Sequence, residues 1–187
     1  MTPLTPTDTS EKELESIIVA ALTGKSGTQP QPLPAIHYKP SIYGSLPYIE
    51  GKTKDYDRDH AVDLDKLITF LNITQPEIME QLAIAEPGPK RHQFLDRLQG
   101  EIAKRGIIDV LRTGIRHGPA SVNLFYGTPT PGNTKAEERY AQNIFSVTRQ
   151  LQYSKDETRL ALDLCLFING LPVATFELKN RLTKQTY

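Results

Sequence analysis

The stretch LDLCLFINGLPVATFELKN, residues 162–180, constrains the fold of this chain more than any other part of it. Two apolar runs, RLALDLCLFI and LPVATFEL, lie on either side of Asn169 and Gly170. An Asn-Gly pair between two such runs is a strong signal for a tight β-turn. The stretch therefore predicts an antiparallel β-hairpin that turns at Asn169 and Gly170.

Three charged residues, Asp163, Glu177 and Lys179, lie on or beside these apolar strands. Asp163 and Glu177 lie at similar distances from the turn, so the hairpin brings them near one another across the strand pair. Glu177 and Lys179 are two positions apart and project to the same face, while Leu178 points the other way, into the core. We therefore expect two carboxylates and one amine to converge.

These charges have two interpretations. Two carboxylates and a backbone carbonyl form an oxygen-rich cup that suits Mg2+, which lowers the pKa of a water that it binds. A lysine beside them can orient or deprotonate that water and stabilise charge on a phosphate, as metal-assisted phosphodiester hydrolysis requires. Alternatively, the three are solvated or salt-bridged residues on the open face of a half-buried sheet. The spacing alone does not decide between the two.

The N-terminal part of the chain is predicted to be mainly helical. EKELESIIVAAL has apolar residues at helical spacing, with N-cap candidates from Thr7 to Ser10 and a stop at Gly24. Residues 25–60 contain repeated prolines and scattered tyrosines, which predicts an ordered excursion over the surface. Residues 60–105 are predicted to be a helical insertion with helices over about 60–71, 76–84 and 89–105.

Residues 106–187 are predicted to form the sheet core that contains the hairpin. IIDVLRTGIRHG and SVNLFYG have the β-branched or alternating apolar residues that are typical of strands. A short helix is expected in TKAEERYAQN, with Thr134 as its N-cap. IFSVTRQLQY alternates between two sets of residues and is expected to be another strand.

Composition narrows the class of protein. With 187 residues the chain suits one domain, and its 22 Lys+Arg balance its 22 Asp+Glu, so bulk charge does not indicate a polyanionic partner. The single cysteine, Cys165, lies in an apolar run, which fits a core position and a reducing compartment. No bilayer-spanning stretch or leader pattern is visible, so we expect a cytoplasmic protein without membrane contact. The sequence NRLTKQTY reads as a loop leading into another element, and we expect the chain to be a fragment of a longer one.

The stretch LDLCLFINGLPVATFELKN resembles the nuclease motif of the restriction subunit of type I restriction-modification enzymes. In that motif an acidic residue opens a strand, FxNGLP forms the turn and ELKN closes it. The likeness extends upstream through RYAQNIFSVTRQLQY, LFYGTPTPGN and VLRTGIRHG to the acidic first helix. Leu162 stands where the motif has proline, a change that removes no ligand.

This resemblance implies an α/β (α+β) fold of the PD-(D/E)xK nuclease type, in which helices flank a mixed central β-sheet, here with helical N-terminal additions. It implies that Asp163 and Glu177 bind Mg2+ together with the backbone carbonyl of Leu178. Lys179 would be the catalytic lysine.

The related nucleases often add a glutamate from the first helix. Glu15, which precedes SIIVAAL, is our choice over Glu11 and Glu13. The alternative is that Glu15 is a solvated acid near the helix N-terminus, where the helix dipole favours negative charge.

The resemblance also implies what the whole protein does. It would be a DNA endonuclease that hydrolyses phosphodiester bonds of unmodified foreign DNA, in a complex with modification (methyltransferase) and specificity subunits. Cutting would follow ATP-driven translocation, with the ATP site in the parent protein outside this segment, because TGKSGT lacks the first glycine of a phosphate-binding loop. The alternatives are a catalytically silent nuclease-fold module that docks to DNA or subunits, and a stand-alone PD-(D/E)xK nuclease.

Several basic residues are candidate DNA contacts. The run from 89 to 117 is locally basic, and from it we single out Arg112 and Arg116, with a solvated helix face as the alternative. Arg149 and Gln150 lie on the strand that leads toward the hairpin and match the family's wording. We predict that these two lie beside the active site.

The four histidines, at positions 37, 60, 92 and 117, are scattered through the sequence. Zinc sites in short motifs have ligands at characteristic spacings, which these histidines lack. The sequence therefore argues against a zinc site and predicts surface or packing roles for them.

Overall fold

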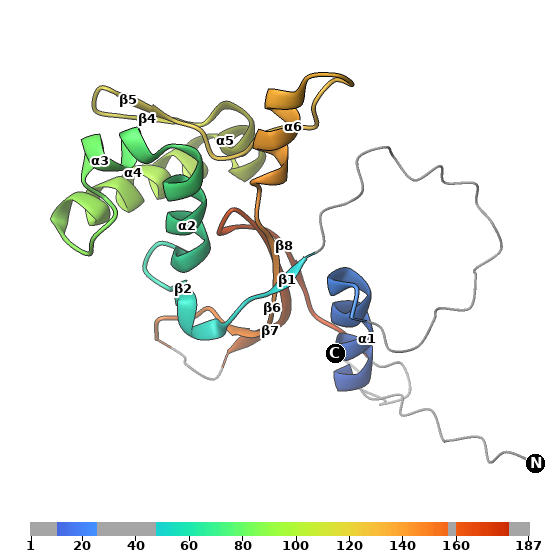
Figure 1. Cartoon of the computed structure of the whole chain (residues 1–187). Coiled ribbons are helices and arrows are strands. Elements are labelled where there is room, and N and C mark those ends of the chain that lie inside the picture. Colours follow the sequence, from blue (N-terminus) through green and yellow to red (C-terminus); the bar gives the residue numbers. More distant parts are fainter. Residues whose placement is uncertain (1–10, 26–47, 157–159, 180–187) are drawn as a thin grey trace, which may run out of the picture.

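A computed structural model of the chain describes residues 11–25, 48–156 and 160–179. Its central element is a four-stranded sheet whose strands are, in order, β1 (Ile49–Glu50), β6 (Phe145–Gln152), β7 (Ala161–Ile168) and β8 (Leu171–Phe176). β1 runs parallel to β6, whereas the other neighbours are antiparallel. The sheet is therefore mixed and is accompanied by helices, which confirms the predicted α/β (α+β) class (Figure 1).

The predicted hairpin is present and turns where the sequence indicates. Asn169 and Gly170 have φ angles of 51° and 81°, the left-handed conformation that a tight two-residue turn requires. Pairing between β7 and β8 continues from the turn as far as Leu164 and Phe176. The hairpin thus supplies two of the four strands of the central sheet.

Among the described residues, β8 is the outermost strand on one side of the sheet. Its register with β7 shifts between Leu166 and Phe167. Phe167 pairs with Pro172, which has no backbone N–H to donate. This edge strand is therefore irregular.

α1 (Glu11–Thr23) covers one face of the sheet, as Figure 1 shows. The helix ends at Gly24, where φ is 69°, in agreement with the predicted stop. Val19 is 5% exposed and packs against Val147 and Leu164 of the sheet. The apolar side of α1 and one face of the sheet therefore share a small core.

The opposite face of the sheet is covered by a short segment that contains η1 (Thr53–Asp55), β2 (Tyr56–Asp57) and β3 (Val62–Asp63). β2 and β3 form a small antiparallel pair of their own. The ring of Tyr56 lies 6.1 Å from the ring of Phe167, in an edge-on arrangement. The sheet is thus covered on both faces.

The predicted surface excursion over residues 25–60 falls largely outside the described residues, because 26–47 are not among them. The part that is described belongs to the fold. Tyr48 packs its ring 5.7 Å from the ring of Phe145, and β1 extends the central sheet. Residues 48–60 therefore contribute to the core structure.

The largest apolar core lies in the helical region, whereas the sequence predicted helices there and a core in the sheet. It is formed by α2 (Leu64–Thr74), α3 (Pro76–Leu82), α4 (Pro89–Arg105) and α5 (Ile107–Thr113). Its most completely buried side chains include Leu67, Phe70, Ile84, Phe94 and Leu98. None of the helices in the described ranges is long and apolar enough to cross a membrane.

Part of the region predicted to be sheet is helical. IIDVLRT forms α5 because Val110 and Leu111 fall on one helical side and are buried in the helical core, while Gly106 and Gly114 delimit the helix. The following strands, β4 (Ile115–His117) and β5 (Ala120–Val122), pair only with each other. The central sheet is therefore smaller than predicted, and its long strands begin at Phe145.

The short helix predicted from Thr134 is α6 (Thr134–Ala141). Its N-cap is Asn133, one residue earlier than predicted, and the Asn133 Oδ1 atom accepts a hydrogen bond of 3.1 Å from the backbone N–H of Ala136. Asparagine is at least as good a cap as threonine, which explains the displacement.

The Asn169–Gly170 turn joins the sheet to the helical region. The Asn169 side chain is completely buried and donates to the Leu124 carbonyl at 2.9 Å, while its Oδ1 accepts from the Ile144 N–H at 2.6 Å. The carbonyl of Gly170 accepts from the N–H of Asp63, the residue that precedes α2, at 2.8 Å. The turn is therefore an internal joint rather than a surface loop.

Candidate active site

A buried carboxylate on α1 is held by two consecutive residues of β6. Glu15 is only 3% exposed. The Nε atom of Arg149 donates to Glu15 Oε1, and a terminal nitrogen of Arg149 donates to Ser16 Oγ at 3.2 Å. Gln150 Nε2 donates to Glu15 Oε2 at 2.8 Å. Both oxygens of Glu15 are therefore paired, which satisfies a charge that would be costly to bury alone.

Gln150 also connects Glu15 to Asp163 of β7. Its amide nitrogen lies 3.2 Å from Asp163 Oδ1, so a single side-chain amide donates to two carboxylates. An amide group carries two N–H bonds and can do this without conflict. Glu15, Arg149, Gln150 and Asp163 thus form one hydrogen-bonded group from three elements, which we call the Gln150 cluster.

The backbone of Gln150 explains how neighbouring residues of one strand reach the same carboxylate. Successive side chains of a regular strand point to opposite faces of the sheet. Gln150 has a φ of 47°, so this alternation is interrupted at its position. Arg149 and Gln150 can therefore both face α1.

Packing on either side of Gln150 shows the interruption directly. Val147 and Leu164 pack toward α1, whereas Leu151 and Leu162 pack with Cys165 and Phe167 on the opposite face. In unbroken strands, Leu151 would share the face of Val147, and Leu162 that of Leu164. The two strands invert together, and Gln150 and Asp163 occupy the inversion point, between the ladder pairs on either side.

The end of β8 fixes the second oxygen of Asp163. The backbone N–H of Leu178 donates to Asp163 Oδ2 at 2.6 Å. Leu178 is half-buried and packs toward Val19, as the sequence predicts for a residue that points into the core. The last ladder pair of the hairpin joins Leu164 to Phe176, so the next step of the register places Asp163 opposite Glu177.

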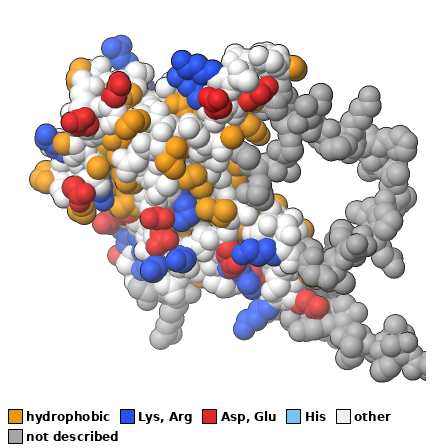
Figure 2. Space-filling view, viewed as in Figure 1, with side chains coloured by type: hydrophobic (Ala, Val, Ile, Leu, Met, Phe, Trp, Pro, Cys, Tyr) orange, Lys and Arg blue, Asp and Glu red, His pale blue; other side chains and the backbone are white. Residues whose placement is uncertain are grey.

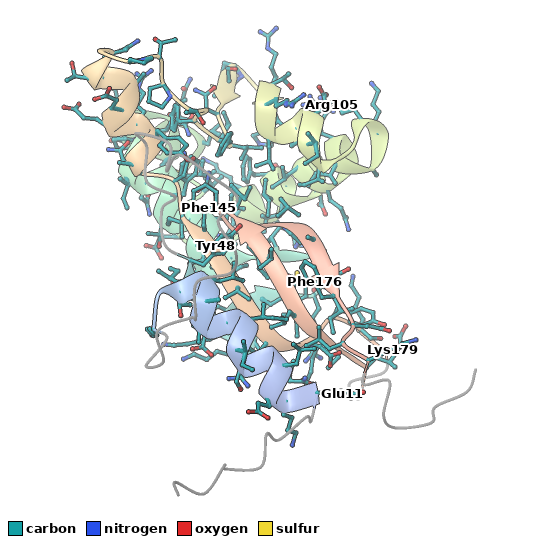
Figure 3. All side chains as sticks on the ribbon, turned by 90° about the vertical axis from the view of Figure 1, so that its right-hand side faces the viewer. Glu11, Tyr48, Arg105, Phe145, Phe176 and Lys179 are labelled. Atoms are coloured by element: carbon teal, nitrogen blue, oxygen red, sulfur yellow. The ribbon has the colours of Figure 1, made fainter. Side chains whose placement is uncertain are left out.

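Glu177 and Lys179 follow directly after β8, and both side chains are exposed. Figure 3 shows Lys179 and Glu11 of α1 at the same end of the molecule. Among the described residues, Glu15, Asp163 and Glu177 do not form a group of three closely spaced potential metal ligands. Hydrogen bonds therefore hold Glu15 and Asp163 together, whereas only strand register relates Glu177 to them.

Arg112 and Arg116, the other candidate DNA contacts, lie elsewhere. Arg112 belongs to α5 and Arg116 to β4, and both are exposed. α5 packs in the helical core together with Leu171, at the turn end of the hairpin. Asp163 lies six residues along β7 from the turn, about 20 Å away at the usual rise per strand residue. The structure thus separates Arg112 and Arg116 from the Gln150 cluster.

The visible charge distribution does not single out one basic surface. Figure 2 shows lysine and arginine side chains interspersed with acidic ones across the displayed face. On α4 and α5, for example, Arg105 is paired with Glu101 at 2.8 Å and with Asp109 at 2.6 Å. Arg97 and Arg105 of the 89–117 run are therefore partly neutralised by neighbouring acids.

Two polar groupings were not foreseen from the sequence. Asp63 is 1% exposed at the start of α2, where its Oδ1 accepts from the Lys66 N–H at 3.1 Å. His60 and His92 lie together with Asp96, although the sequence, in which the histidines have no metal-ligand spacing, predicted only surface or packing roles for them. The spacing of His92 and Asp96, one helical turn apart, was a signal that the sequence did contain.

Comparison with known families gives one match. The family model described as type I restriction enzyme R protein N terminus matches residues 50–187. That range includes Arg149, Gln150, Asp163 and the segment from Glu177 to Lys179 but begins after α1. No curated protein and no solved structure matches the chain.

Proposed function

This chain belongs to the family of type I restriction enzyme R protein N-termini, and from that premise we propose that it is a Mg2+-dependent DNA endonuclease domain. It would hydrolyse phosphodiester bonds of unmodified foreign DNA within a multi-subunit restriction complex. The observation that carries the proposal is the pair of hydrogen bonds to Asp163, one from Gln150 of the Gln150 cluster and one from the backbone N–H of Leu178, which lies between Glu177 and Lys179. The resemblance of LDLCLFINGLPVATFELKN to the nuclease motif supports the same assignment.

The available donors fit a hard divalent cation. Asp163 and Glu177 offer carboxylate oxygens and Leu178 offers a backbone carbonyl, and Mg2+ prefers such oxygen ligands. Each oxygen of Asp163 accepts one hydrogen bond, from Gln150 or from Leu178, and keeps further lone pairs for a metal. Bound Mg2+ would polarise the phosphate and favour deprotonation of the attacking water.

The protein's own residues would act around that ion. The Gln150 amide and the Leu178 N–H orient the Asp163 carboxylate, so that it is held before substrate arrives. Lys179 would stabilise negative charge that develops on the phosphate and orient the nucleophile. Glu15, whose two oxygens are already paired with Arg149 and Gln150, would act as a positioning residue.

Cleavage of plasmid DNA by the restriction complex containing this chain tests the proposal. We expect Asp163→Ala to abolish cutting and Lys179→Ala to lower its rate by at least about 100-fold, because each removes transition-state stabilisation. ATP hydrolysis by the same complexes should remain. Asp156→Ala and Lys135→Ala, which remove exposed groups elsewhere, are matched controls. Undiminished cutting by both site variants would show that the site assignment is wrong.

A second candidate function is a nuclease-fold module that docks to DNA or partner subunits without cutting. It is favoured by the absence, among the described residues, of a ready group of three carboxylate ligands at Asp163. Calorimetric titration with Mg2+ and Mn2+ separates the two functions. A nuclease domain should bind the ion in a manner that Asp163→Asn abolishes, whereas a docking module should show no binding that depends on Asp163.

The specific partners follow from the same proposal. Membership in this family implies a multi-subunit complex. We infer that the modification and specificity subunits choose the DNA site and that an ATP-driven motor in the parent protein delivers DNA to this domain. The local mixing of charges fits this arrangement, because a domain that receives DNA from other subunits needs no strong affinity of its own.

A further inference from the structure

Two histidines and an aspartate from distant parts of the sequence meet at the junction of the β2–β3 turn and α4. His60 lies in the turn and is 6% exposed, whereas His92 and Asp96 lie one turn apart on the exposed side of α4. One potential ligand atom from each residue lies within 4.8 Å of those of the other two. We call these three residues the His60 cluster.

Both ring nitrogens of His60 face carboxylate oxygens, although a neutral ring can donate a hydrogen bond to only one of them. Nδ1 lies 2.8 Å from Asp57 Oδ2 and Nε2 lies 3.3 Å from Asp96 Oδ1, so the ring stands between two carboxylates. A neutral imidazole donates through only one nitrogen. If Nδ1 donates to Asp57, the Nε2 lone pair faces an oxygen of Asp96. A cation at Nε2, either a proton or a metal ion, removes this repulsion.

The position of the Asp57 carboxylate favours a proton on Nδ1 of His60. Its Oδ1 accepts the backbone N–H of Asp59 at 2.8 Å and that of His60 at 3.3 Å, which fixes the carboxylate within the turn. Its Oδ2 is thereby directed at the imidazole. A carboxylate behind a histidine is the arrangement that orients histidine ligands in many metal sites, because it fixes the tautomer and the ring.

His92 and Asp96 complete the set from α4. His92 Nδ1 lies 2.9 Å from Asp96 Oδ2, and the His60 and His92 rings meet edge-on with centroids 4.8 Å apart. The Asp96 carboxylate therefore lies between the two imidazoles, with one oxygen toward each.

We propose that His60 Nε2, His92 Nδ1 and the Asp96 carboxylate bind a Zn2+ ion. Zinc prefers imidazole nitrogen and carboxylate oxygen in a tetrahedral arrangement with bonds of about 2.0 to 2.2 Å, which places ligand atoms roughly 3.4 Å apart. Small rotations of the exposed His92 and Asp96 side chains close the remaining gap. Water would take the fourth position, and the ion would tie the β2–β3 turn to α4.

This site is distinct from the proposed Mg2+ site in both chemistry and residues. Imidazole ligands favour zinc and similar transition metals, whereas the donors near Asp163 are all oxygen. Calorimetric titration of the chelator-treated chain with ZnCl2 is the primary test. We expect one ion per chain, and the same binding in Asp163→Asn, which removes the proposed Mg2+ ligand.

Variants of the exposed ligands provide the decisive comparison. His92→Ala and Asp96→Asn should each lower zinc affinity by at least about 10-fold, and Asp57→Asn by about 10- to 100-fold through loss of ring orientation. Glu77→Gln, an exposed acid on α3, is the matched control and should bind zinc normally. Far-UV circular dichroism establishes that each variant is folded, and thermal unfolding should show a zinc-dependent rise in Tm for the wild type but not for His92→Ala.

Replacement of Zn2+ by Co2+ gives an independent readout, because a four-coordinate Co2+ site with nitrogen ligands absorbs strongly in the visible range. The absorption should be present in the wild type and in Glu77→Gln and be lost in His92→Ala. Absence of zinc binding by the wild type, or equal binding by His92→Ala and the wild type, would overturn the proposal.

Discussion

At the scale of single residues, Gln150 combines two functions in the candidate active site. Its side-chain amide links Glu15 to Asp163, and its left-handed backbone lets Arg149 face the same helix. A non-glycine residue in this conformation is strained, typically by about 1 to 3 kcal/mol, and such strain is common at functional sites. The hydrogen bonds to both carboxylates help to hold the backbone in this state.

Gln150→Glu tests whether the amide holds the two acids together. A third carboxylate would face Glu15 and Asp163, so we expect the free energy of unfolding at pH 8 to fall by about 1 to 2 kcal/mol. The loss should be smaller at pH 4, where the introduced carboxyl can take up a proton. Urea unfolding at the two pH values measures both effects. Gln152→Glu on the same strand is the control, because Gln152 accepts a hydrogen bond from Arg58; equal stability of the two variants would contradict the assigned role.

Asp63 is a second residue whose negative charge is destabilised by burial. Burial raises its pKa, although the backbone hydrogen bond and the charge of Lys66 act in the opposite direction. Its Oδ2 has no hydrogen-bond partner in the described structure, and the ammonium group of Lys66, 3.8 Å away, is shared with Asp55 and Asp65. The folded state therefore binds the proton of the Asp63 carboxyl group more tightly than the unfolded state does. The contribution of Asp63 to the stability of the fold is complete below the ordinary pKa of 3.8, where the carboxyl is protonated, and is lost as the pH rises through the raised pKa.

Asp63→Asn should therefore stabilise the fold at high pH. The asparagine Oδ1 can still accept the N–H of Lys66, while the buried negative charge, whose Oδ2 atom has no hydrogen-bond partner, is gone. We expect a gain of about 1 kcal/mol in the free energy of unfolding at pH 8, with the gain disappearing toward pH 4. Asp65→Asn, which alters an exposed partner of the same lysine, should show no such pH dependence in urea titrations. A loss of stability at pH 8 would mean that the Lys66 ion pair outweighs burial.

At the scale of elements, the hairpin turn both sets the strand register and anchors the helical region. A Cβ atom on Gly170 would lie 2.4 Å from the carbonyl oxygen of Asp63 and 2.6 Å from the backbone nitrogen of Leu67. These are backbone atoms at the start of α2, which cannot move without displacing the helix. Gly170 is therefore required for its lack of a side chain as well as for its positive φ.

Gly170→Ala and Gly24→Ala separate these two requirements. Both glycines have positive φ, at 81° and 69°, but nothing lies within 4 Å of a Cβ atom on Gly24. Backbone strain alone should cost Gly24→Ala about 1 kcal/mol, whereas steric overlap should bring the cost of Gly170→Ala to about 3 kcal/mol or more. Thermal or urea unfolding gives the comparison. Equal losses would show that α2 yields to the added methyl group.

Local sequence patterns predicted the hairpin and several helices correctly but gave the wrong secondary structure for α5. Asn169-Gly170 between apolar runs predicted the hairpin because the turn chemistry is local, and proline and cap residues predicted α2 to α4. β-Branched residues made IIDVLRT resemble a strand, and only burial of Val110 and Leu111 against other helices makes it α5. Tertiary packing decided where local preference was weak.

In the candidate site, too, some features follow from local sequence and others only from tertiary packing. The register of Asp163 and Glu177 follows from hairpin counting, and Arg149 and Gln150 were expected beside it from the resemblance. The inversion at Gln150 could not be predicted, because glutamine carries no signal for positive φ. Nor could the meeting of His60 with His92, since it depends on how the β2–β3 turn packs against α4.

At the scale of the whole molecule, the Asn169–Gly170 turn connects the central sheet to the helical region. The hairpin contributes to both, because Ile168 and Leu171 pack with the helical core while Leu164 and Phe167 belong to the small cores of the sheet. The buried side chain of Asn169 bonds to Leu124 and Ile144, and Gly170 bonds to the residue before α2. We therefore expect the sheet and the helical region to unfold as one cooperative unit.

Cys165 provides a probe of this cooperativity. Its thiol is 1% exposed in the sheet, and burial raises its pKa to about 12, so it should not react with iodoacetamide at pH 8 in the native state. In a urea series its alkylation should follow the same transition as far-UV circular dichroism, which reports mainly the helices. Gly170→Ala should move both transitions together. Alkylation at urea concentrations that leave the helices intact would show that the sheet opens independently.

The irregularity of edge strand β8 affects how readily the sheets of two chains can pair. An exposed strand edge is a template on which other chains can add strands and aggregate, and short length, proline and a shifted register are the usual protections. β8 has the last two, with Pro172 placed at the register shift. Several copies held close together during synthesis or assembly would thus find a poor surface for joining sheet to sheet.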